Sequence, residues 1–124
     1  MKQIALISLA LLIAAGCSQA ATEFSDPNQP IEIKAGSEFN ILLEANPTTG
    51  FHWEIVDELD PNVVEYVSNE YTANQPVLTG SGGKDHWKFK AMATGETRIT
   101  LGYYPPSNDP VEPYQTVTFT VTVK

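Results

Sequence analysis

The side chains that could do chemistry are few, and their spacing does not form a catalytic or metal-binding pattern. Ser81, Asp85 and His86 are the nearest match to a Ser–His–Asp triad. Neighbouring residues of a strand point to opposite faces, however, so Asp85 cannot easily orient His86. The other histidine, His52, has no further ligands at the spacing that a metal site needs. We therefore expect no catalytic residue, no metal site and no cofactor.

The most informative segment is an uncharged turn between two strand-like runs, Asn46-Pro47-Thr48-Thr49-Gly50-Phe51. Proline fixes its own φ and favours an extended residue before it, and glycine can adopt backbone angles that other residues avoid. The loop should therefore hold one shape in solution. Because an ordered loop loses less entropy on binding, we interpret this segment as a loop presented to a partner.

The first sixteen residues are typical of an export signal: a positive charge at Lys2, an apolar run over residues 4–13 and small residues before Cys17. The run is too short for a comfortable membrane span. Ala14-Ala15-Gly16-Cys17 resembles a bacterial lipobox, in which the cysteine becomes the lipidated first residue. The alternative is an ordinary cleaved signal with an incidental cysteine. We expect export to the bacterial cell envelope and a lipid anchor at Cys17. Ser18 lacks the carboxylate that often retains lipoproteins at the inner membrane, which favours the outer membrane.

Length, charge and cysteine content limit what the rest of the chain can be. We divide it into a signal peptide (residues 1–16), a polar, lipid-anchored tether (17–30) and one folded domain (31–124), because no second core would fit. Fifteen acidic residues against seven basic ones make nucleic acid a poor partner. A single cysteine allows no internal disulfide, so stability must come from packing. We expect a monomer.

Apolar and polar residues alternate along the folded domain, as in strands with one buried face. The alternation predicts strands near residues 31–34, 38–45, 51–56, 63–71, 84–92, 97–104 and 114–123. In the least regular of them, 63–71, a short helical turn after Pro61 would also fit. The pattern indicates an all-β fold, an immunoglobulin-like β-sandwich of about seven antiparallel strands.

Sandwich topology predicts where the unusual residues gather. If successive strands run antiparallel, every second connection lies at the same end, so we expect loops 46–50, 72–83 and 105–113 on one rim. Any one loop rich in glycine and proline would be ordinary for a sandwich. Three such loops on one rim favour a binding surface.

The 46–51 segment resembles the first signature loop of the chagasin-like inhibitors of papain-family cysteine proteases, which carry Asn-Pro-Thr-Thr-Gly followed by an aromatic residue. Gly80-Ser81-Gly82-Gly83 is similar to the second signature, a glycine-rich loop before an aromatic-bearing strand. Tyr104-Pro105-Pro106 occupies the place of the third, which usually reads Arg-Pro followed by Trp or Phe. Here the chain departs from the family, because Pro105 and Ser107 stand where the arginine and the aromatic residue are expected. Tyr104 or Tyr114 would have to substitute.

The resemblance covers the chain from about Ile31 to Lys124 and implies a wedge, in which three loops enter the active-site cleft of a papain-like protease. Thr48 and Thr49 would face the catalytic centre, and Gly82 and Gly83 would let the main chain approach the enzyme closely. The protein would be a reversible inhibitor, not an enzyme. The alternative is a non-inhibitory, immunoglobulin-like binding or adhesion module of the cell envelope.

Overall fold

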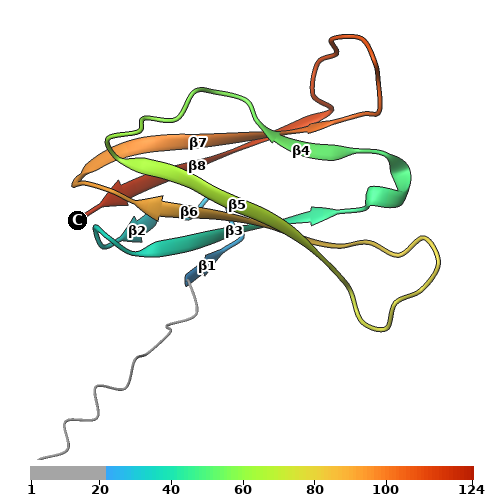
Figure 1. Ribbon diagram of the computed structural model, residues 1–124, viewed down its shortest axis with the longest axis horizontal. Helices are drawn as coiled ribbons and strands as arrows, with labels where there is room; N and C mark the ends of the chain where they lie inside the picture. The colour runs from blue at the N-terminus through green and yellow to red at the C-terminus, as the bar shows by residue number, and fades with distance from the viewer. Residues whose placement is uncertain (1–21) are drawn as a thin grey trace, which may run out of the picture.

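The computed structural model describes residues 22–124, which form a two-layered β-sandwich (Figure 1). Its elements in chain order are β1 (Thr22–Phe24), β2 (Ile31–Ile33), β3 (Glu38–Ala45), the 3₁₀ turn η1 (Pro47–Thr49), β4 (His52–Ile55), β5 (Val64–Ala73), β6 (Gly83–Ala91), β7 (Gly95–Tyr104) and β8 (Gln115–Val123). One sheet has the strand order β1-β3-β6-β5, and the other has the order β2-β8-β7-β4. The signal segment and Cys17 lie outside the described residues.

The predicted immunoglobulin-like sandwich is confirmed, and the seven predicted strands are all present with ends shifted by at most two residues. An eighth strand, β1, lies in the segment that we expected to be a tether. It pairs with β3 in parallel, and Phe24 packs edge-on against Phe39 at 6.2 Å. The β2–β8 pairing is parallel too, so both sheets are mixed and not purely antiparallel as predicted. Phe24 is the only large apolar side chain of β1, so this strand shows no alternation that could be read from the sequence.

The segment after Pro61 contains both structures that the sequence left open. The amides of Val63 and Val64 donate to the carbonyl of Asp60 at 3.0 Å, which closes one turn of helical type. The strand β5 then begins at Val64. The irregular alternation in this strand has a cause, because its register against β6 shifts between Tyr66 and Ser68.

Apolar side chains from the inner faces of the two sheets form one core. Phe39 and Phe89 stack across β3 and β6 at 5.7 Å, and Trp53 and Trp87 are 7% and 6% exposed, as expected of packing residues. The most completely buried side chains are Ile31, Phe39, Ile41, Val64, Phe89, Ile99, Leu101, Phe119, Val121 and Val123. Among residues 22–124 no polar or charged residue is buried, so the core is held by apolar packing.

The three loops predicted to share one rim do so. We call them the first loop (residues 46–51), the second loop (74–82) and the third loop (105–114); all three lie at the right-hand end in Figure 1. The register explains this, because β3 and β5 both run antiparallel to β6, so that Ala45 and Ala73 end beside Gly83. Thr22 and Lys124 lie toward the opposite end. Over the described range the chain has no helical segment with the length and hydropathy of a membrane span.

Candidate functional site

The first loop is a closed turn at the centre of the rim. Asn46 is extended, with φ −138° and ψ 90°, and Gly50 is left-handed, with φ 81°. Both conformations agree with the expectation from Pro47 and Gly50. The amide of Thr49 donates to the carbonyl of Asn46 at 3.1 Å, and the amide of Gly50 donates to that of Pro47 at 3.0 Å. The backbone therefore forms its own scaffold without a partner.

The side chains of the first loop tie it further to itself. The Oδ1 of Asn46 accepts from the amide of Thr48 at 3.3 Å and from its Oγ1 at 2.5 Å. The Oγ1 of Thr49 donates to the carbonyl of Asn46 at 2.7 Å and accepts from the amide of Phe51 at 3.3 Å. Residues 47–50 are all exposed. An exposed loop held by this many bonds is already in one conformation before it binds.

Contacts with the neighbouring loops make the rim one continuous surface. The Nδ2 of Asn46 donates to the carbonyl of Gly80 at 3.1 Å, which joins the first loop to the second. On the other side, a Cβ added to Gly50 would lie 3.0 Å from the Cβ of Pro106 in the third loop. Gly50 thus serves two needs, its positive φ and this close approach.

A row of aromatic rings supports the first loop from below. The ring centroids of Trp53 and Tyr103 lie 4.8 Å apart, those of Tyr103 and Phe51 5.1 Å, and those of Phe51 and Tyr114 5.9 Å. Phe51, which the sequence placed at the loop edge without a clear role, is half-buried and part of this row. Aromatic pairs at these distances stabilise beyond the area they bury.

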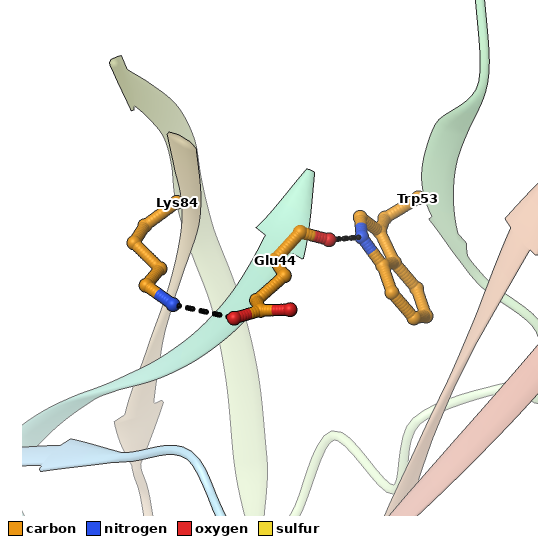
Figure 2. A network of polar contacts seen from close by, with 3 residues as sticks. All are labelled: Glu44, Trp53 and Lys84. Carbon is orange, nitrogen blue, oxygen red and sulfur yellow. Dashed lines mark hydrogen bonds and ion pairs between the residues drawn. The ribbon is translucent and has the colours of Figure 1, made fainter. Parts of the chain in front are cut away.

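The same rings bind the end of β3 at the base of the first loop. The indole Nε1 of Trp53 donates to the carbonyl of Glu44 at 3.0 Å, and the carboxylate of Glu44 is paired with Lys84 at 3.2 Å (Figure 2). The amide of Asn46 donates to the hydroxyl of Tyr103 at 3.4 Å. Since β1 pairs with β3 only as far as Ile41, these bonds satisfy backbone groups beyond β1 and fix where the loop starts.

The second loop presents apolar side chains on a closed tip. The Oγ of Ser81 donates to the carbonyl of Leu78 at 2.8 Å and accepts from the amide of Leu78 at 3.2 Å. Val77 and Leu78 are each 64% exposed. Neither residue was among the site residues expected from the sequence. Their signal was present, as an adjacent apolar pair outside any alternating run, with Pro76 before it and Gly80 after it.

In the third loop, the structure separates the two tyrosines that could replace the missing aromatic residue. Tyr104 is half-buried and stacks on the His52 ring at 6.1 Å. Tyr114 is 77% exposed. The expected position of the anchor, Ser107, is occupied by a short exposed side chain whose Oγ accepts from the amide of Asp109 at 3.1 Å.

Comparison with known proteins identifies the family. Residues 32–123 match the model of the chagasin family of peptidase inhibitors, I42. The chain belongs to this family. Amoebiasin-1 of Entamoeba histolytica is 41% identical over 81 residues, which are 64% of this chain and 76% of that protein. Chagasin of Trypanosoma cruzi is 32% identical over 97 residues, 76% of this chain and 86% of that protein.

Solved structures share the fold of this chagasin-family chain. The crystal structure of the cysteine protease inhibitor EhICP2 from Entamoeba histolytica matches with a TM-score of 0.68 at 23% identity, over 84% of this chain and 96% of that one. PbICP-C, solved in complex with falcipain-2, matches with a TM-score of 0.55 at 19% identity, over 85% and 90%. The protein is therefore a peptidase inhibitor by family and not an enzyme.

Most of the residues implied by the chagasin resemblance come together on the rim, but Gly83 does not belong to a loop. It is buried in β6, where an added Cβ would overlap the carbonyl of Thr72 and lie 2.8 Å from the Cα of Ala73. At Gly82, a Cβ would lie 2.8 Å from the carbonyl oxygen of Ala45. Gly83 thus lies in a strand and not in the loop where we expected it, and packing within the fold requires a residue without a side chain at this position.

The residues first considered for catalysis have other partners. Asp85 accepts from the Nε1 of Trp87 at 3.0 Å, and the Oγ of Ser81 is bound to Leu78. Burial raises the pKa of Asp85 above its usual range, while the Trp87 hydrogen bond and the nearby His86 act in the opposite direction. His52 is exposed, with Glu54 at 3.5 Å. Residues 22–124 hold no group of three side chains that could bind a metal ion.

Proposed function

We propose that this protein is a reversible inhibitor of papain-like cysteine proteases and that it inserts its three rim loops into the active-site cleft. One observation carries the proposal: the first loop has the family's signature sequence, is exposed and is locked by its own hydrogen bonds between two other loops. By their names, EhICP2 inhibits a cysteine protease and PbICP-C binds falcipain-2, and these relatives support the choice of target class.

The shape and chemistry of the rim suit a cleft. The first and second loops contain no charged residue, and the only charges in the third loop are Asp109 and Glu112. The second loop, which carries the exposed Leu78, and the third loop, which carries the exposed Tyr114, lie on either side of the first loop (Figure 1). The first and second loops can therefore exclude water from the enzyme's catalytic groups without burying a charge of their own. We expect an interface of standard size, on the order of 1,600 Å².

The locked first loop also explains how an inhibitor could occupy a protease cleft without being cut. Cleavage requires the scissile peptide to distort toward a tetrahedral geometry. The bonds from Thr48 to the Asn46 side chain and from Thr49 to the Asn46 carbonyl oppose that distortion and would hold the two ends together if a peptide bond broke. The inhibitor should therefore remain uncut after hours of contact with the enzyme.

Inhibition of papain by the purified mature protein tests the proposal. We expect an inhibition constant below about 1 μM, since a pre-ordered interface of standard size commonly reaches that range. Mass spectrometry after incubation with excess papain should show no cut between Pro47 and Gly50. Full papain activity at micromolar concentrations of the protein would instead favour the non-inhibitory envelope binding module, and rapid cutting of the first loop would make it a substrate.

We further propose that Cys17 is lipidated and anchors the protein to the bacterial outer membrane. The lipobox-like sequence supports this, and the topology is compatible with it. Thr22 begins β1, which runs parallel to β3 toward the first loop, so the chain enters the domain from the end opposite the rim. An anchor five residues before Thr22 would leave the three loops facing away from the bilayer.

Metabolic labelling with a clickable fatty acid tests the anchor. The full chain should incorporate the label and sediment with membranes, and the Cys17→Ser variant should lose both properties, because the chain has no other cysteine to acylate. Washed membranes carrying the wild-type protein should still inhibit added papain. Equal labelling of the two proteins would refute lipidation, and masked inhibition on membranes would refute the orientation.

A further inference from the structure

Tyr114 has the most exposed large apolar or aromatic side chain among residues 22–124, at 77%. Val77 and Leu78 follow at 64%. An isolated exposed aromatic ring needs no explanation in a soluble protein. Tyr114, however, stands on the rim at the end of the third loop, beside the first loop, where the proposed partner would lie.

The ring of Tyr114 is exposed, but contacts with neighbouring residues restrict its position. Its amide donates to the carbonyl of Tyr103 at 2.8 Å, which fixes the backbone at the start of β8. Its ring meets that of Phe51 edge-on, with centroids 5.9 Å apart and planes at 83°. Phe51 in turn packs on Tyr103, whose hydroxyl accepts from the amide at the start of the first loop. The ring is thus held in a fixed relation to the threonine turn, which lowers the entropy that binding would cost.

The other side chains in and next to the third loop offer less apolar area, and Val111, the other exposed large apolar residue of the loop, is 41% exposed and has no ring. Pro106 packs against Gly50, and Tyr104 stacks on His52. Ser107 has only a hydroxyl, which accepts a hydrogen bond within the loop. Tyr114 is therefore the side chain through which this loop can bury most area on a partner. Tyrosine is also enriched among the residues that dominate binding at protein interfaces.

We infer that Tyr114 is the main contact residue of the third loop and that it determines which proteases are bound. This rests on the proposed inhibitory function. Because the ring stands next to the first loop and not at the tip of the third, the partner must offer an apolar hollow close to its catalytic centre. The phenol hydroxyl can form a hydrogen bond there with a polar group of the partner, as donor or as acceptor. Papain-like enzymes with a charged or filled cleft wall at that place should be bound poorly.

Inhibition constants for papain, measured with single variants, test this inference. Tyr114→Ala should weaken inhibition about 30-fold, the size of loss typical of a dominant interface residue. Tyr114→Phe should cost only about fivefold, because it keeps the ring and loses one hydrogen bond. Met92→Ala is the matched control, since Met92 is an exposed apolar residue, 42% exposed, in the turn between β6 and β7 at the opposite end. It should inhibit like the wild type.

The outcomes separate this inference from the proposed function. If Tyr114→Ala inhibits within twofold of the wild type while charged residues in the first loop abolish inhibition, the inference fails and the inhibitory function stands. If neither change has an effect, the proposed function fails as well. Should Tyr114→Ala lower the thermal midpoint, Tyr114→Gln decides, because it has a long side chain to cover Phe51 but no ring. Unimpaired inhibition by that variant would overturn the inference.

Discussion

Replacing Thr48 and Thr49 together with glutamate should abolish inhibition of papain, with a loss of at least about 1,000-fold. Two carboxylates would be carried into the protease cleft and lose their water, and each uncompensated charge at the centre of an interface costs several kcal/mol. The thermal midpoint should fall by no more than about 5 °C, because both residues are exposed and the backbone bonds of the turn remain. Titrating papain with the variant, alongside a thermal melt, measures both quantities.

Two matched variants show whether the position or the chemistry of the change matters. Thr94→Glu adds a carboxylate to an exposed threonine in the turn between β6 and β7, at the opposite end, and should leave inhibition unchanged. The Thr48→Ser, Thr49→Ser double variant retains the hydroxyls that bind the loop to itself and should keep most of the activity. Undiminished inhibition by the glutamate variant would show that the first loop does not enter the cleft. A large fall in its thermal midpoint would mark the loop as part of the folding core.

The conformation of the first loop could be predicted because its causes are local. Pro47 restricts the residue before it, and a left-handed turn at its end requires Gly50, so six consecutive letters contain most of the geometry. The seven strands other than β1 were predictable for a similar reason, since the alternation of apolar and polar residues reports which face is buried. The strand β1 was not, because Phe24 is its only large apolar residue and its position in the sheet depends on packing against Phe39 of β3.

The support beneath the rim could not be predicted, because it depends on which strands become neighbours. Phe51, Trp53, Tyr103 and Tyr114 meet only through the register of β4 against β7 and the hydrogen bond from Tyr114 to Tyr103. Alternation places Trp53 and Tyr103 on inner faces, but it does not say that their polar atoms will bind the end of β3. The family signature marks the residues of the loop, whereas the residues that hold the loop in place are scattered.

Gly83 shows the same limit, and it leads to the largest stability effect that we expect. Its sequence context suggests an open glycine-rich loop, yet it lies buried between Ala45 and Ala73 in the sheet. A methyl group there would overlap the carbonyl of Thr72, so β5 and β6 would have to separate at the base of the second loop. We expect Gly83→Ala to destabilise the fold by about 3 kcal/mol, because overpacking against backbone cannot be relieved by a rotamer change. The thermal midpoint should fall by roughly 10–20 °C in a differential scanning measurement.

Gly80→Ala is the control that separates crowding from backbone torsion. Gly80 has φ 77° but would meet no atom within 4 Å if it carried a Cβ, so the substitution should cost only the torsional penalty, about 1–2 kcal/mol in an exposed loop. If Gly83→Ala melts no lower than Gly80→Ala, the ends of β3, β5 and β6 do not pack closely enough around Gly83 to exclude a methyl group. Inhibition should rank the two variants differently when papain is titrated well below both midpoints. Gly80→Ala acts on the carbonyl that binds Asn46 and so loosens the first loop directly. Gly83→Ala affects the first loop indirectly, through a shift of Ala45. We therefore expect Gly80→Ala to weaken inhibition more than Gly83→Ala does, although Gly83→Ala lowers the thermal midpoint more.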